Sequence, residues 1–158
     1  MQLDKFDRQL LNLVQQDASM AAEGLAEQVP LSPSAIQRRL RRLREQGVIV
    51  RDVAMLDPVQ IGQPNFFIVS LEVEREHPEL LEQLRAWLAR HEQIQQAFYV
   101  TGAADFVIIV TAPDMAAFDT LMSALMKDNP NVKRFTTNVC LGLVKRGLHI
   151  PVPLDGGD

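Results

Sequence analysis

Cysteine, histidine and long apolar runs are scarce in this chain of 158 residues, and each scarcity excludes a class of structure. Cys140 is the single cysteine, so an intramolecular disulfide and a cysteine-ligated zinc site are both excluded. The three histidines are far apart in the sequence and form no metal-like cluster. The longest apolar runs, such as 106–110, are too short to span a bilayer. Because no signal pattern precedes the first helix, we expect a cytoplasmic protein. We also expect no cofactor.

Net positive charge is lacking in the chain as a whole but is concentrated in one segment. The total is −4, yet residues 31–51 contain six arginines and one acid, which gives +5 there and leaves −9 elsewhere. Such asymmetry favours a focused nucleic-acid surface. A solvated helix face is the alternative, although solvated faces usually alternate charge sign. The arginines are Arg38, Arg39, Arg41, Arg42, Arg44 and Arg51.

Residues 31–47 predict one short helix with clear ends. Ser32 is a good N-cap, Pro33 suits the first helical position, and Gly47 suits the left-handed residue beyond the end. Apolar residues at helical spacing predict one buried stripe, with arginines on the opposite face. The stripe consists of Ile36, Leu40 and Leu43, and the opposite face carries Ser34, Arg38, Arg41 and Arg42.

Two helices are expected before this arginine-rich helix. Asp4 predicts the N-cap of a helix that ends at about Asp17, and a shorter helix is expected over 21–29. A tight turn at 30–32 then leads into the arginine-rich helix. This order is the helix-turn-helix plan, in which the second helix of the pair enters the DNA major groove.

The small domain is expected to cover residues 1–55 and to end in a strand over 48–55. In that strand, Arg51 is available to a DNA phosphate. Proline and glycine then interrupt regular structure, so a linker is expected at 56–64.

Residues 65–148 alternate strand and helix patterns in the order βαββαβ. That order predicts an α+β, ferredoxin-like domain with an antiparallel sheet and both helices on one face. A proline- and glycine-containing flexible tail is expected over 149–158. The expected strands are 66–74, 94–101, 105–111 and 132–144. The expected helices are 78–91, with Leu81, Leu84 and Leu88 inward, and one that Asp114 caps, with Phe118, Leu121, Met122 and Leu125 inward.

The sheet also predicts a partner. Residues 66–69 and 106–110 are apolar at every position, as in strands that are buried on both faces. Because two helices cover only one face, a second copy of the sheet is the simplest cover for the other. A dimer also suits DNA reading by two helices related by a two-fold axis. The alternative is that the DNA-reading domain folds over the sheet.

Taken together, these motifs resemble the Lrp/AsnC (leucine-responsive, feast/famine) transcription regulators over about residues 3–148. The similarity lies in the order and spacing of several short motifs. They are Leu3-Asp4 with Asp7, Leu25-Ala26, the segments 31–34, 39–43 and 47–49, Asp57-Pro58 with Gly62, the segment 100–106, Val132 with Thr137, and Val144-Lys145.

This resemblance implies a sequence-specific DNA-binding regulator, not an enzyme, that forms homodimers and often octameric rings. Ser34, Arg38, Arg41 and Arg42 are expected to face the groove, and Arg39 and Arg51 to contact the DNA backbone. Arg39 lies nearer the apolar stripe, so packing is an alternative role for it. The complete set of expected DNA-binding residues is Ser32, Ser34, Gln37, Arg38, Arg39, Arg41, Arg42 and Arg51.

The resemblance also implies an amino-acid effector, held where the sensing domains of neighbouring dimers meet. Gly102 would let the backbone approach the ligand, Asp105 would take its α-ammonium group, and two threonines offer hydroxyl groups. A plain hairpin turn is the alternative. The expected effector residues are Thr101, Gly102, Ala103, Ala104, Asp105 and Thr137.

Two further functions stay open at this point. The small apolar pair Ala103-Ala104, where the family often has an acidic or bulkier polar residue, fits a ligand-independent architectural DNA-binding protein. Some siroheme decarboxylase subunits have the same two-part architecture, but here the arginines are concentrated on the expected recognition helix.

Overall fold

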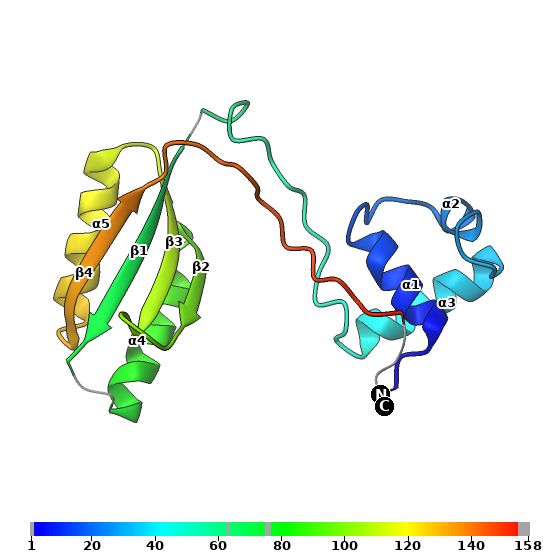
Figure 1. Ribbon diagram of the computed structural model, residues 1–158, viewed down its shortest axis with the longest axis horizontal. Helices are drawn as coiled ribbons and strands as arrows, with labels where there is room; N and C mark the ends of the chain where they lie inside the picture. The colour runs from blue at the N-terminus through cyan, green and yellow to red at the C-terminus, as the bar shows by residue number, and fades with distance from the viewer. Residues whose placement is uncertain (1, 63, 75–76, 155–158) are drawn as a thin grey trace. The chain divides into compact units, whose positions relative to one another are not determined.

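The computed structural model describes residues 2–62, 64–74 and 77–154, and the chain forms two compact units (Figure 1). One unit consists of Met1–Met55 together with Lys145–Asp158, and the other of Leu56–Val144. The chain therefore leaves the first unit and returns to it near the C-terminus. Gln63 of the expected linker and residues 155–158 of the expected tail lie outside the described residues.

Three helices build the first unit: α1 (Lys5–Val14), α2 (Ala22–Ala26) and α3 (Pro33–Glu45). Asp4 caps α1, and the Asp4 and Asp7 carboxylates each accept a hydrogen bond from the backbone N–H of the other residue. This reciprocal arrangement is a capping box. α1 ends earlier than expected because the N–H groups of residues 16 and 17 both turn back to the Leu13 carbonyl. α2 is likewise shorter than the expected 21–29.

The arginine-rich helix α3 has the predicted ends. Ser32 Oγ accepts a hydrogen bond from the Ala35 N–H at 3.3 Å, and Pro33 is the first helical residue. Gly47 has a φ of 70°, in the left-handed region that favours glycine after a helix. The apolar stripe lies in a core shared by all three helices, with Leu10, Leu25, Ile36 and Leu43 at its centre.

The strand expected over 48–55 is absent. This segment has no regular structure, and Val50 and Val53 are 84% and 59% exposed. A strand forms when its backbone pairs with a neighbour, and no such pairing is present for it in residues 2–62, 64–74 and 77–154. The prediction is therefore wrong for the single chain.

The second unit confirms the ferredoxin-like prediction. Its neighbouring strands are all antiparallel, in the order β2-β3-β1-β4. The elements are β1 (Asn65–Val73), α4 (Pro78–Arg90), β2 (Ile94–Tyr99), β3 (Phe106–Ala112), α5 (Met115–Asp128) and β4 (Val132–Val139).

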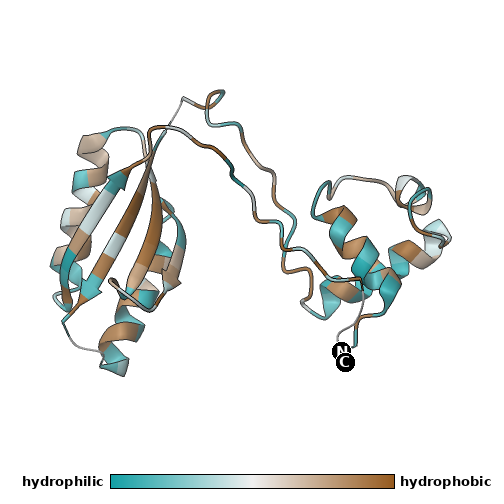
Figure 2. Ribbon diagram, in the orientation of Figure 1, coloured by the Kyte–Doolittle hydropathy of each residue, from teal (hydrophilic) through white to brown (hydrophobic). Residues whose placement is uncertain are grey.

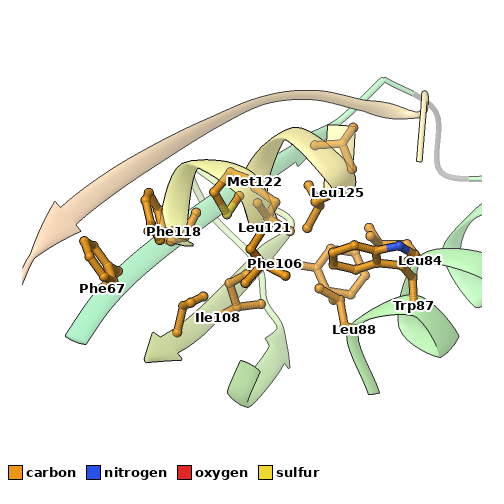
Figure 3. Packing of buried hydrophobic residues seen from close by; sticks show 14 of the residues in the cluster. Phe67, Leu84, Trp87, Leu88, Phe106, Ile108, Phe118, Leu121, Met122 and Leu125 are labelled. Atoms are coloured by element: carbon orange, nitrogen blue, oxygen red, sulfur yellow. The ribbon is translucent and has the colours of Figure 1, made fainter. Parts of the chain in front are cut away.

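Both helices pack on one face of this sheet. Figure 3 shows Phe67, Phe106 and Ile108 of the sheet pointing toward the apolar side chains of α4 and α5. Phe67 stacks on Phe118 with ring centroids 4.0 Å apart. Trp87 of α4, absent from the predicted inner face, is 4% exposed and donates a hydrogen bond from Nε1 to Asp128 at 3.0 Å. The predicted helix positions Leu81, Leu84, Leu88, Phe118, Leu121, Met122 and Leu125 are all buried.

β4 is shorter than the expected 132–144. Its last backbone bond to β1 runs from the Cys140 N–H to the Phe66 carbonyl, and β1 itself begins at Asn65. β4 therefore ends close to where β1 begins, and among the described residues no strand pairs with 141–144.

The opposite face of the sheet remains apolar and partly exposed. Ile68 is 37% and Phe98 is 49% exposed, and Val107 and Ile109 are partly buried between them. Cross-strand register places these side chains on the face away from the two helices, because directly opposed residues share a face. In Figure 2, β3 is coloured as hydrophobic along most of its length.

Within the tail expected at 149–158, residues 150 and 152 have hydrogen-bond partners. Val152 exchanges two hydrogen bonds with the side chain of Asn12 on α1, and Ile150 exchanges two with the side chain of Gln15, the C-cap residue of α1. No local pattern predicts this arrangement, because prolines and apolar residues such as Ile150 and Val152 also occur in flexible tails. Side-chain amides on α1 provide the partners that a local sequence pattern does not reveal.

Candidate DNA-binding surface and effector site

Burial of the apolar stripe turns the polar side of α3 outward. Of the eight expected DNA-binding residues, Arg39 and Arg42 are partly buried and the other six are exposed. Ser32 and Ser34 lie together at the N-terminus of α3, with their hydroxyl oxygens 3.2 Å apart. A helix N-terminus with hydroxyl groups suits a DNA phosphate. The exposed six are Ser32, Ser34, Gln37, Arg38, Arg41 and Arg51.

Arg39 and Arg42 are engaged by carboxylates of the first helix and its cap. Arg39 Nη1 lies 2.6 Å from Asp4 Oδ2 and 2.8 Å from Asp7 Oδ1. Arg42 Nη2 lies 2.6 Å from Asp7 Oδ2. The Asp7 side chain is only 1% exposed, so both of its oxygens are used inside the protein. The Arg39 guanidinium also lies 5.7 Å above the Phe6 ring.

The ion pair between Asp4 and Arg39 lowers the pKa of the carboxyl group and raises that of the guanidinium group. Burial alone would raise the pKa of Asp4, but hydrogen bonds from the Asp7 N–H and the Arg39 guanidinium outweigh it and hold that pKa below its ordinary value. Hydrogen bonds to Asp4 and then Asp7 raise the pKa of Arg39. Both shifts favour the charged forms of Asp4 and Arg39, and this ion pair joins the start of α1 to α3.

Sequence reasoning did not identify Asp7 as a site residue, and it did not predict the contact between Asp7 and Arg42. The expectation placed Arg42 with Arg38 and Arg41 on the groove side, whereas its guanidinium donates to Asp7. A signal for this contact existed: Asp7 shares a helical face with Leu10, Leu11 and Val14. A carboxylate among buried residues requires a cationic partner.

Arg44 is also paired, through Nε and Nη2 to Asp52 Oδ2 at 3.3 Å and 3.1 Å. Both side chains are about two-fifths exposed, so the pair is a surface ion pair that stabilises little. It fixes the segment after Gly47 against the end of α3.

The loop after β2 carries most of the expected effector residues. Gly102 has a φ of 119°, and a Cβ placed there would meet nothing within 4 Å. Glycine is therefore needed for the backbone conformation and leaves open space beside the loop. Thr101 and Ala103 are exposed, and Ala104 is partly buried.

Asp105 has a structural role in the single chain. Its Oδ2 accepts a hydrogen bond from the Val73 N–H at 2.7 Å, and its own N–H donates to the Leu71 carbonyl. These bonds attach the hairpin to the end of β1. Asp105 Oδ2 is therefore occupied by a backbone N–H, which favours the hairpin-turn alternative over ligand binding for that oxygen.

Thr137 lies away from this loop. It pairs across β4 and β1 with Val69, and Val69 pairs with Ile108 on β3. The strand β1 therefore separates Thr137 from the loop, and one chain does not bring the expected effector residues together. Thr137 Oγ1 is buried and has no hydrogen-bond partner within the part of the chain that the structure describes.

In residues 2–62, 64–74 and 77–154, no group of three or more His, Cys, Asp and Glu side chains is arranged to hold a metal ion. The helices of these residues are all too short or too polar to cross a membrane.

Two family models match the chain. Residues 3–44 match the AsnC-type helix-turn-helix domain, and residues 67–149 match the Lrp/AsnC ligand binding domain. An HTH-type transcriptional regulator of Sinorhizobium fredii is 38% identical over 98% of this chain and 91% of its own length. The leucine-responsive regulatory protein of Salmonella typhimurium is 32% identical over 91% of this chain and 88% of its own.

Solved structures agree in fold. An AsnC family transcriptional regulator from Agrobacterium tumefaciens superposes with a TM-score of 0.85 at 26% identity, over 94% of this chain and 97% of that one. A transcriptional regulator of Neisseria meningitidis in complex with L-Met has a TM-score of 0.84 at 24% identity, over 95% and 97% of the two chains, and supports the fold alone. With its helix-turn-helix, its ferredoxin-like domain and both family models matched in order, the chain belongs to the Lrp/AsnC family of DNA-binding transcription regulators.

Proposed function

We propose that this regulator divides the arginines of α3 between two tasks. Arg38 and Arg41 read base edges in the major groove together with Ser34 and Gln37, while Arg39 and Arg42 hold the helix in place. The observation that supports this division is the buried Asp7 carboxylate, whose two oxygens accept from Arg39 and Arg42. An arginine that is committed to such a buried carboxylate is poorly suited to reading bases.

Ser32 and Arg51 then contact phosphates on either side of the reading residues. Each bidentate arginine–guanine contact discriminates by about 1–3 kcal/mol, whereas a phosphate contact weakens all sequences alike when it is lost. Substitution of a reading residue should therefore reduce the preference for a specific site. Substitution of Arg51 should reduce affinity for every DNA and lower its salt dependence.

The test is DNA binding by fluorescence anisotropy, with a site selected from a random pool and with unselected DNA. Arg38→Ala should lower the ratio of the two affinities by about tenfold, equivalent to about 1.4 kcal/mol. Arg90→Ala, an exposed arginine at the end of α4 in the other unit, is the matched control and should leave the ratio unchanged. An unchanged ratio in Arg38→Ala contradicts the reading role.

We also propose that the chain acts as a homodimer through the exposed face of its sheet, with larger rings such as octamers as the next level. Ile68, Phe98, Val107 and Ile109 supply a contiguous apolar surface there. Contiguous exposed apolar surface of this kind marks an interface. Ile109→Asp should convert the main species in analytical ultracentrifugation to a monomer, and an unchanged mass would contradict this interface.

The amino-acid effector is proposed to bind at the loop 101–105, with Thr137 supplied by a neighbouring copy. The open space beside Gly102 supports the loop as the binding place, and the name of the 32% identical leucine-responsive relative supports an amino acid as the ligand. Leucine and methionine are the first amino acids to test, followed by the remaining eighteen. A ligand at about 100 times its dissociation constant should add about 2.7 kcal/mol to the stability of the protein.

The alternative is a ligand-independent architectural protein, which the small apolar pair Ala103-Ala104 favours. No change in stability or DNA affinity with any of the twenty amino acids would select it. We further propose that the chain acts in the cytoplasm by binding and not by catalysis, because its relatives are transcription regulators. A tetrapyrrole that changes its absorption spectrum on titration with the protein would contradict the second point.

A further inference from the structure

The last described residues lie along α1 in a regular ladder of hydrogen bonds. Asn12 Nδ2 donates to the Val152 carbonyl at 2.8 Å, and the Val152 N–H donates to Asn12 Oδ1 at 2.9 Å. Gln15 Nε2 donates to the Ile150 carbonyl at 2.9 Å, and the Ile150 N–H donates to Gln15 Oε1 at 2.8 Å. Arg8 Nη1 donates to the Pro153 carbonyl at 3.2 Å.

The two sequences match each other in spacing. Arg8, Asn12 and Gln15 lie four and three residues apart, which places them on one face of a helix. In an extended segment, alternate residues point to the same side. Ile150 and Val152 use both of their backbone groups on α1, whereas the prolines at 151 and 153 have no N–H group to leave unpaired. Each residue of the segment that has both a backbone N–H and a backbone carbonyl to bond, Ile150 or Val152, therefore lies opposite one side-chain amide, that of Gln15 or Asn12.

One apolar anchor accompanies the ladder. Val152 packs against the core of the three helices, while Ile150 is 72% exposed. Backbone bonds plus a single buried side chain are the usual way in which a protein surface binds an extended, proline-containing peptide. The ladder is therefore a peptide-binding surface, occupied in this structure by the end of the same chain.

We propose that the surface formed by Arg8 and Asn12 of α1 and by its C-cap residue Gln15 is a docking surface for the segment Ile150–Pro153 of the same chain. Its role is to give the DNA-binding unit a second attachment to the ligand-binding domain. The chain already joins the two units once, between Met55 and Leu56, and the docked segment closes a second connection after Val144.

A second attachment restricts the DNA-binding unit before it meets DNA. Part of the motional freedom of the DNA-binding unit is then lost before binding, so less entropy is lost when DNA is bound. A tethered unit therefore binds DNA more tightly without any new DNA contact. This consequence rests on the proposed DNA-binding function. The docking itself does not, and the two are tested separately.

Hydrogen exchange of the backbone amides tests the docking in the full-length protein without DNA. The amides of Ile150 and Val152 should exchange slowly, and the double substitution Asn12→Ala with Gln15→Ala should return both to the rate of an unstructured peptide. Alanine favours helix, so α1 itself should remain folded. Gln16→Ala, which removes an exposed amide just beyond α1, is the control and should leave both amides protected.

Fast exchange of these two amides in the unchanged protein would overturn the docking. Slow exchange that persists in the double variant would overturn the assignment of the surface to α1.

Crosslinking decides whether the segment comes from the same chain. With Cys140→Ser, the pair Gln16→Cys and Ile150→Cys keeps the Asn12 and Gln15 amides and places two thiols near one rung of the ladder for a short bis-maleimide. A product of monomer mass in a denaturing gel supports the proposal. A product of dimer mass shows that the segment is exchanged between copies and overturns it.

DNA affinity tests the attachment. A chain that ends at His149 should bind its selected DNA about tenfold more weakly than a chain that ends at Leu154. Equal affinities would overturn the second attachment. If the full-length protein binds no DNA, the proposed function fails instead, and the exchange experiment still decides the docking.

Discussion

The two units of this chain hold themselves together in different ways. Among the described residues, sixteen buried apolar side chains form the core of the ligand-binding unit and only eight form that of the DNA-binding unit. The smaller unit adds polar cross-links: the ion pairs of Asp7 with α3 and the ladder between α1 and residues 150–153. Apolar packing is non-directional, whereas these polar links fix orientation. The unit that must present a helix to DNA therefore depends more on directional contacts.

The largest expected effect comes from the apolar core of the ligand-binding unit. Phe67→Ala should lower its free energy of unfolding by about 4 kcal/mol, because the ring is fully buried and stacked on Phe118. The fluorescence of Trp87, the single tryptophan, reports this unit in urea titrations. Met115→Ala, at a side chain of α5 that is 56% exposed, is the control and should cost less than about 0.5 kcal/mol. Equal losses would mean that burial does not set the stability of this unit.

The next effect tests the polar links of the DNA-binding unit. Asp7→Ala leaves Arg39 and Arg42 without their shared carboxylate and should cost about 3 kcal/mol. Circular dichroism at 222 nm detects it as an early loss of helix, with no change in the Trp87 transition. Asp4→Ala, at a carboxylate that is 49% exposed, should cost far less. Similar losses for the two variants would contradict the special role of the buried carboxylate.

A smaller effect is expected at the start of the recognition helix. Ser32→Ala removes the oxygen that accepts from the Ala35 N–H and should cost about 1 kcal/mol. Ser32→Asp should retain the stability, because aspartate is an equally good cap. It should nevertheless weaken DNA binding by placing a negative charge near the phosphates. Retained DNA affinity in Ser32→Asp would exclude a phosphate next to this residue.

The smallest effect is a pH dependence from Asp4. The pKa of its carboxyl group lies below the ordinary value of 3.8, so the unfolded chain takes up the proton first as the pH falls. The stabilisation is therefore complete above pH 3.8 and is lost as the pH falls through the lower folded pKa. Asp4→Asn should flatten the stability profile of the DNA-binding unit in this acid range. A profile that is unchanged by the substitution would show that Asp4 contributes nothing to it.

Sequence reasoning predicted what local rules determine. The cap at Ser32, the left-handed Gly47 and the stripe of Ile36, Leu40 and Leu43 all follow from rules that act within one or two helical turns. The βαββαβ order and its inner helix faces follow from periodicity. These features gave the fold and the position of the recognition helix.

The errors all concern partners that are distant in sequence. The strand at 48–55 lacks a neighbour, β4 ends where β1 begins, and residues 150–153 find side-chain amides on α1. The contact of Arg42 with Asp7 was not predicted, because helical spacing says nothing about which acid lies opposite. Its partner Asp7 is 35 residues away in the sequence. Such contacts depend on tertiary packing. The position of Asp7 on the apolar face of α1 is the one local feature that indicates such a contact.

The most direct test of the account compares Arg41→Ala with Arg42→Ala, two neighbours on one helix. Anisotropy titrations with selected and unselected DNA give the ratio of affinities for each variant. The account predicts that Arg41→Ala lowers this ratio by about tenfold at unchanged stability. Arg42→Ala should keep the ratio and lower the stability of the DNA-binding unit. If Arg42→Ala lowers the ratio of affinities and Arg41→Ala leaves it unchanged, the proposed division of the arginines between base reading and helix positioning is wrong.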